Sequence, residues 1–145
     1  MKIVLQRVKH CTVSINGHGI SRIGKGVLVL LGIDKKDTLA AADFLCEKCA
    51  TLRIFPDERG KMGLSLIDAG GEALVVSQFT LFGDCGKGRR PSFSRAAPPD
   101  KGKELYEYFV KKLRTLVPNV ATGIFGAMMD VELLNDGPVT LLLEK

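Results

Sequence analysis

The sequence predicts one α+β domain over residues 1–145, with mainly antiparallel sheets and two helices packed against them. A length of 145 residues suits one domain, and no linker, internal repeat or low-complexity tract divides it. Most of the chain consists of short segments in which apolar residues alternate or run together, as in strands. Only two segments repeat apolar residues at spacings of three and four, the pattern of a helix with one buried face.

The sequence of the first part of the chain is typical of strands. Residues 2–9 and 11–15 are short segments of alternating apolar residues, and Asn16-Gly17 is a hairpin turn signal. The segment ISRIG continues the hairpin, and residues 26–33 are apolar on both faces, as in a strand buried from both sides.

A helix is expected next, over roughly residues 38–54, with Asp37 as its cap and Pro56 as its stop. Cys46 and Cys49 form a C-x-x-C pair, but no second pair follows and both lie on one helix face. Burial as small hydrophobic residues is therefore favoured over zinc or redox chemistry. The expected apolar stripe consists of Leu39, Ala42, Leu45, Cys46, Cys49 and Leu52.

The sequence of the second half of the chain indicates further strands and one more helix. Residues 74–81 (LVVSQFTL) form a buried strand, and a second helix starts at Asp100 and ends before Pro118. Further strands are expected at ATGIF, AMMDVELL and VTLLLEK, the last two separated by NDGP. The expected buried face of the second helix consists of Leu105, Tyr108, Phe109, Leu113 and Leu116.

Composition and charge narrow the class of protein. Hydrophobic residues make up 46% and charged residues 26%, which excludes a disordered chain. The longest apolar run, residues 27–33, is far shorter than the ~20 residues that a membrane span needs. Gln6, Arg7 and Lys9 interrupt the apolar core of any secretory signal at the start of the chain. We therefore expect a cytoplasmic protein with free thiols and no membrane partner.

The positive charge gathers in one glycine-rich loop. Lys and Arg number 21 against 16 Asp and Glu, and the loop GDCGKGRRPSFSR carries Lys87, Arg89, Arg90 and Arg95. Two arginines stand where a Walker A loop has Lys-Ser/Thr, so that assignment is rejected. Charge alone leaves phosphate or RNA contact and a merely solvated loop equally open. Phe93 either stacks on a base or anchors the loop.

Motifs for acid–base or metal catalysis are missing. The two histidines, His10 and His18, lie in or beside the N-terminal hairpin, and no metal-ligand spacing occurs, so no metal or cofactor is expected. The end of the strand at residues 74–81 is unusual because Ser77, Gln78 and Thr80 are polar and flank Phe79. These residues either leave the core or surround backbone N–H groups that polarise a carbonyl oxygen.

A second unusual segment is NDGPVT at residues 135–140. It is either a plain turn between two strands or a Gly137–Pro138 unit with a cis bond, which would present bare main-chain carbonyls to a ligand. The spacing by itself favours the turn.

Four motifs together resemble the D-aminoacyl-tRNA deacylases, formerly called D-tyrosyl-tRNA deacylases. They are VVSQFTLFGD (75–84), GRRPSFS (88–94), TGIFGAMM (122–129) and NDGPVT (135–140), and their order and spacing fit along essentially the whole chain. The resemblance implies a barrel-like fold and a homodimer with active sites at the subunit interface. It also implies a hydrolase that cleaves the carboxylic ester joining a D-amino acid, or glycine mischarged on tRNA-Ala, to the 3′ end of tRNA. Such an enzyme performs chiral proofreading in translation.

The same resemblance implies roles for particular residues. A cis Gly137–Pro138 unit enters the partner's active site, where its oxygens hold the substrate α-amino group and exclude an L side chain. Arg7 holds that unit in place. For catalysis we expect Ser77, Gln78, Phe79 and Thr80 to form the site, with backbone N–H groups on the carbonyl oxygen, attack by water and help from the 2′-hydroxyl of the tRNA. Thr80 is a weak nucleophile without a base, so a positioning role is favoured.

Lys87, Arg89 and Arg90 are the expected tRNA contacts, and no DNA partner is expected. Two alternatives stay open. A non-catalytic RNA-binding module would use the basic loop alone, but it has no need for the Gly-Pro pair. A relative that removes L-residues from mischarged tRNA differs in the strand motif, and the SQFTL form argues against it.

Overall fold

The computed structural model describes all 145 residues, and its centre is one long strand. Strand β1 (Lys2–Ile15) pairs along one edge with β8 (Asp130–Glu144). Along its other edge the first half pairs with β3 (Gly26–Gly32) and the second half with β2 (His18–Ile23), and all three pairings are antiparallel. The sequence predicted two short strands in place of β1 and two in place of β8. Both breaks are instead irregularities within one ladder, which pairing with a distant strand sustains.

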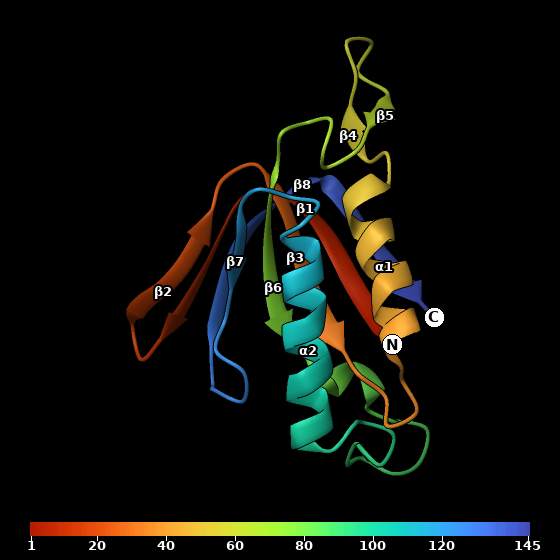
Figure 1. Cartoon of the computed structure of the whole chain (residues 1–145). Coiled ribbons are helices and arrows are strands. Elements are labelled where there is room, and N and C mark those ends of the chain that lie inside the picture. Colours follow the sequence, from red (N-terminus) through yellow and green to blue (C-terminus); the bar gives the residue numbers. More distant parts are fainter.

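The sheet continues with parallel strands and curls toward closure. Strand β6 (Glu72–Ser77) pairs parallel with β3, and β7 (Val120–Thr122) pairs parallel with β6. The path β2-β1-β3-β6-β7 brings its two ends together, where the Ser21 hydroxyl donates to the Thr122 carbonyl at 2.9 Å. Figure 1 shows β2 beside β7, so the sheet is a nearly closed barrel with mainly antiparallel pairing. The expected α+β class is therefore confirmed.

Residues 55–64 form a small hairpin of their own. Strand β4 (Phe55–Pro56) pairs antiparallel with β5 (Met62–Leu64). The hairpin projects beyond the end of α1 in Figure 1. Its tip is closed by Asp57, whose carboxylate accepts hydrogen bonds from the Arg59 and Lys61 N–H groups.

Two helices, α1 (Leu39–Thr51) and α2 (Pro99–Leu113), lie side by side against one face of the sheet (Figure 1). The main core fills the space between them and the sheet, with Leu45, Phe109 and Leu113 almost completely buried. A second, smaller core of Val8, Cys11, Val13, Ile23, Leu28, Leu74 and Val76 lies on the other side. Neither helix is long and apolar enough to cross a membrane.

Three details of the helices differ from the prediction. The α1 cap is Thr38, because the Asp37 carboxylate instead accepts hydrogen bonds from the Asp34 N–H and the Met1 amino group. On α2 the buried tyrosine is Tyr106 rather than Tyr108. Leu39 is exposed, because it lies at the first residue of α1.

The cysteines are free, and three of them are buried. Burial raises the pKa of the Cys46 thiol to about 12, and burial likewise raises the pKa of Cys49. The prediction that this pair packs as small hydrophobic residues is confirmed. Cys85 is the exposed one and lies in the basic loop.

Candidate active site

The SQFTL segment is a strand end followed by a tight turn. Strand β6 stops at Ser77, and Phe79–Phe82 form the 3-10 helix η1. The prediction that the strand runs to residue 81 is therefore wrong. The parallel ladder ends with the Gln78 N–H, which donates to the Leu31 carbonyl at 2.8 Å. An apolar run of this length has no internal signal that separates a strand from a short helix.

This turn decides which backbone N–H groups are free. The sequence predicted a carbonyl-binding role for the N–H groups around Gln78, Phe79 and Thr80, but the ladder uses that of Gln78. The N–H groups of Phe79 and Thr80 lie in the first turn of η1, where a helix supplies no acceptor of its own. Both residues are exposed, and the Gln78 side-chain amide donates to the Thr80 hydroxyl. The turn therefore offers two adjacent N–H donors to an oxygen ligand.

Phe93 links this turn to the basic loop. Its ring meets the Phe79 ring edge to face, with centroids 5.1 Å apart and an interplanar angle of 69°. Of the two roles considered for Phe93, the structure gives it the anchoring contact, although 39% of the residue is still exposed. Movement of the loop would therefore act directly on the aromatic ring next to the candidate N–H donors.

The basic loop is closed at its base and open at its tip. Asp84 and Ser92 exchange two backbone hydrogen bonds of 2.7 and 2.9 Å. Lys87, Arg89 and Arg90 lie between them, exposed and without an ion-pair partner in the chain. Three of the four basic residues singled out in the sequence thus remain available to an anionic partner.

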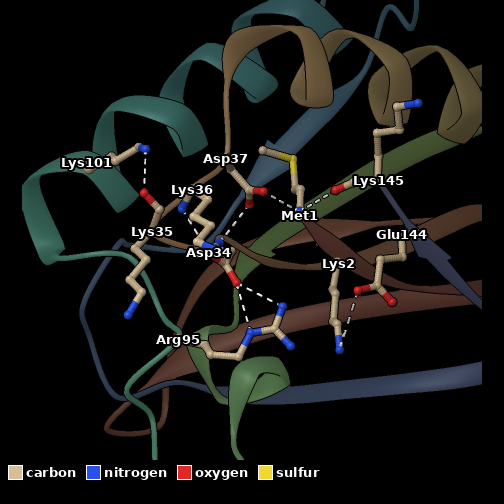
Figure 2. Close-up of polar contacts among 10 residues, drawn as sticks. All are labelled: Met1, Lys2, Asp34, Lys35, Lys36, Asp37, Arg95, Lys101, Glu144 and Lys145. Atoms are coloured by element: carbon tan, nitrogen blue, oxygen red, sulfur yellow. Dashed lines mark hydrogen bonds and ion pairs between the residues drawn. The ribbon is translucent and has the colours of Figure 1, made fainter.

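The fourth, Arg95, fastens the loop to the body of the protein. Its guanidinium pairs with the Asp34 carboxylate, at 3.1 Å from Nε and 3.0 Å from Nη2 (Figure 2). The Lys36 N–H and then Arg95 donate to this carboxylate, and these hydrogen bonds lower the pKa of Asp34. The Lys35 N–H also donates to the Arg95 carbonyl at 3.1 Å. The loop is therefore held at the turn between β3 and α1.

The NDGP segment lies within β8, and the Gly137–Pro138 bond is cis. The plain turn favoured by the spacing is therefore wrong, and the cis unit implied by the resemblance is present. Gly137 has φ +118°, a left-handed value that L side chains rarely adopt. A Cβ at this position would lie 2.8 Å from Val139 Cγ2 and 3.0 Å from Arg7 Nη2, so a side chain has no room here.

Arg7 of β1 forms an ion pair with Asp136, next to this unit. Its side chain is only 10% exposed, its Nε lies 2.9 Å from Asp136 Oδ2, and its Nη1 donates to the Ile54 carbonyl. The Nε–H is not aligned for a hydrogen bond, so the contact with Asp136 is an ion pair. A contact from Arg7 was predicted from the sequence, whereas one from Asp136 was not, although Asp136 lies directly before Gly137 in the motif.

The two motifs lie far apart within one chain. Ser77 pairs with Leu31 and so lies level with Ile3 of β1, whereas Gly137 lies level with Arg7. The Gly137–Pro138 unit therefore occupies a different position on the sheet from the η1 turn, and no hydrogen bond joins the two within one chain.

An exposed apolar surface lies beside η1 and β8. Strand β8 pairs only with β1, so its outer edge is free, and Leu142 is 81% exposed. A surface pocket of about 260 Å³ lies there and includes Lys2, Val4, Leu81 and Leu142. The free edge and the apolar pocket are typical of a surface that another protein chain covers.

The remaining polar candidates form no second site. His18 Nδ1 contacts the Asn16 carbonyl of its own turn at 3.0 Å, and His10 is half-buried. Nowhere do three or more His, Cys, Asp or Glu side chains gather as metal ligands do.

Comparison with known proteins agrees with the motif resemblance. The family model described as D-Tyr-tRNA(Tyr) deacylase matches residues 4–144. A D-aminoacyl-tRNA deacylase of Thermosipho melanesiensis is 57% identical over 145 residues, covering 99% of this chain and 97% of that protein. One of Pelobacter propionicus is 54% identical, with both chains covered completely. The solved structure of the c-Myc DNA Unwinding Element Binding Protein superposes with a TM-score of 0.95 at 42% identity, covering 100% of this chain and 99% of that one.

A match over nearly the whole chain, with relatives more than half identical, confirms the resemblance drawn from the four motifs. The η1 turn, the basic loop and the cis Gly137–Pro138 unit all fall inside the matched residues. The protein therefore belongs to the D-Tyr-tRNA(Tyr) deacylase family.

Proposed function

We propose that this protein is a cytoplasmic hydrolase that cleaves the ester between a D-amino acid and the 3′ end of tRNA. It acts as a homodimer, discriminates against L-aminoacyl-tRNA, and thereby keeps translation homochiral. The observation that carries the proposal is the presence of two exposed backbone features, the η1 turn and the Gly137–Pro138 unit, that no hydrogen bond joins within one chain.

The chemistry proposed at the η1 turn is carbonyl polarisation. The ester carbonyl oxygen accepts from the Phe79 and Thr80 N–H groups, which also stabilise the negative charge that develops on it. The water oxygen bonds to the acyl carbon, the bond to the tRNA 3′ oxygen breaks, and the leaving oxygen takes up the proton. The neighbouring 2′-hydroxyl of the tRNA assists, so the protein needs no histidine here. Thr80, which accepts a hydrogen bond from Gln78, positions the substrate and does not attack it.

The proposed chirality filter comes from the partner subunit. Within one chain no hydrogen bond joins the Gly137–Pro138 unit to the turn, and in the proposed dimer the unit of the second subunit fills the site. Its main-chain oxygens hold the substrate α-amino group, and an L side chain would then collide with it, whereas a D side chain points away. Glycine has no side chain to exclude, so glycyl-tRNA mischarged on tRNA-Ala is also a substrate. The free edge of β8 and the exposed Leu142 supply the surface for dimerisation.

The proposed tRNA contacts are Lys87, Arg89 and Arg90 at the loop tip. Binding through phosphates weakens steeply with salt, so neutralising these three residues should flatten the salt dependence of tRNA binding. A triple variant with glutamine at all three positions tests this. The matched control replaces Arg22, Arg59 and Lys111 by glutamine, because these residues are exposed, carry the same charge and lie elsewhere. Equal effects of the two triple variants would contradict a specific role for the loop.

The decisive experiment compares deacylation of D-Tyr-tRNA and L-Tyr-tRNA by the purified protein, with and without a chelator. Rapid loss of the D-ester alone, unaffected by chelation, supports a metal-independent chiral hydrolase. Binding of tRNA without hydrolysis of either ester would support the RNA-binding module instead. Preferential loss of the L-ester would support the relative of opposite chirality. A duplex DNA competitor should displace tRNA poorly, and efficient displacement would contradict the expectation of no DNA partner.

A further inference from the structure

Four consecutive residues of β8 stand outside its ladder with β1. Gln6 pairs with Thr140 and Val8 with Asn135, so two steps along β1 correspond to five along β8. The residues between them, 136–139, therefore form a protrusion that contains the Gly137–Pro138 unit. Such a protrusion interrupts the backbone hydrogen bonds that normally keep a strand in place.

The side chain of Asn135 replaces the interrupted bonds. Its Nδ2 donates to the Arg7 carbonyl at 2.9 Å and to the Val139 carbonyl at 3.0 Å. The first carbonyl belongs to the facing strand β1, and the second to the far end of the protrusion. One amide group thus joins both ends of the protrusion to the strand behind it, and both of its donor hydrogens are used.

The orientation of the Asn135 amide is set by a hydrogen bond to its oxygen atom. Its Oδ1 accepts from the Thr140 hydroxyl at 3.1 Å, and that hydroxyl accepts from the Gln6 side chain at 3.2 Å. The chain of bonds runs from Gln6 through Thr140 to Asn135 and ends on two backbone carbonyls. Its donors and acceptors alternate consistently, so each bond favours the next.

We propose that Asn135, oriented by Thr140, is a positioning residue that sets the placement of the Gly137–Pro138 carbonyls and thereby the strictness of selection against L-aminoacyl esters. This inference rests on the proposed function, in which the unit enters the partner's active site. Arg7 holds the protrusion from one side through Asp136, whereas Asn135 closes its base. Both contacts are needed to fix a segment that has left its ladder.

The test is the ratio of D-Tyr-tRNA to L-Tyr-tRNA deacylation rates in isosteric variants. Asn135→Asp replaces the donor by an acceptor facing two carbonyls, and we expect the ratio to fall at least tenfold. Thr140→Val removes only the orienting hydroxyl and should lower the ratio by a smaller factor, whereas Thr140→Ser should restore it to the wild-type value. The matched control is Asn119→Asp, the same chemical change at an exposed residue with no side-chain hydrogen bond, which should leave the ratio unchanged.

A structural role alone would lower stability and the amount of active protein without changing this ratio. Folded Asn135→Asp protein with the wild-type ratio would therefore overturn the inference. If Asn135→Asp does not fold, Thr140→Val against Thr140→Ser decides, and equal ratios in these two variants would overturn it. The wild type is measured first, because failure to prefer the D-ester would overturn the proposed function, whereas wild-type preference with unchanged variants would overturn only the role of Asn135.

Discussion

Substituting Gly137 by alanine adds one methyl group at the point of the proposed chirality filter where a Cβ has no room. The added Cβ would lie 2.8 Å from Val139 Cγ2, 3.0 Å from the Val139 backbone nitrogen and 3.0 Å from Arg7 Nη2. The backbone nitrogen is part of the strand, and the guanidinium is held by Asp136 and the Ile54 carbonyl. The added methyl group and these atoms cannot all keep their positions, so the Gly137–Pro138 unit or its neighbours have to move.

The size of the expected effect follows from the backbone conformation of Gly137 and from the contacts of the added methyl group. A residue with a side chain at φ +118° carries strain of about 1–3 kcal/mol before any collision is counted. Each 1.4 kcal/mol corresponds to a factor of ten. A shift of about 2 kcal/mol therefore lowers the equilibrium constant for the native placement of the unit, relative to displaced placements, by about thirty-fold. We expect the D-Tyr-tRNA deacylation rate to fall at least tenfold, together with the ratio of D-ester to L-ester rates.

The assay is the initial rate of deacylation of both esters at equal concentrations of folded protein. Gly17→Ala is the matched control, because Gly17 has φ +77° but a Cβ there would meet nothing within 4 Å. This control carries the same kind of backbone strain in a distant hairpin and should leave both rates unchanged. Folded Gly137→Ala protein that retains the wild-type D-ester rate and the wild-type ratio would refute the steric explanation.

Three further predictions concern single side chains. Thr80→Ala should retain much of the deacylation rate, because the backbone N–H groups remain, and complete loss would indicate that the hydroxyl attacks the ester. Tyr106→Phe removes the donor to the Val75 carbonyl at 2.9 Å and should lower the free energy of unfolding by about 1–3 kcal/mol. Urea denaturation measures this change, and an unchanged midpoint would contradict it. The pKa of Asp34 in the folded protein is lowered below 3.8, first by the Lys36 N–H and also by Arg95. Its ionised form therefore stabilises the fold above the unfolded-state pKa and loses this effect as the pH falls through the folded-state pKa. Asp34→Asn should lower stability at pH 7, with a difference from wild type that shrinks below about pH 4, near the ordinary carboxyl pKa. A difference that stays constant with pH would contradict this assignment.

Local pattern was sufficient for the elements whose residues are neighbours in the sequence. The spacing of apolar residues placed α1 and α2, and the Asn16-Gly17 pair placed the β1–β2 hairpin. Helix periodicity and turn chemistry act over a few residues, so a single sequence contains them. The burial of Cys46 and Cys49 also followed from their spacing alone.

The motifs of the candidate site were visible in the sequence, but their geometry was not. The contact between Asn135 and Arg7 joins residues 128 positions apart, and no local pattern reports it. The same holds for the Gln78 N–H, which the ladder with β3 uses, and for Asp37, whose carboxylate is occupied by distant partners. In each case a contact with a residue far away in the sequence overrides the structure that the neighbouring residues favour. The sequence by itself therefore determined the fold class, the family and the residues of interest. Only the tertiary structure decided where β6 ends, which N–H groups stay free and how the Gly137–Pro138 unit is held, because those depend on strands that meet only after folding.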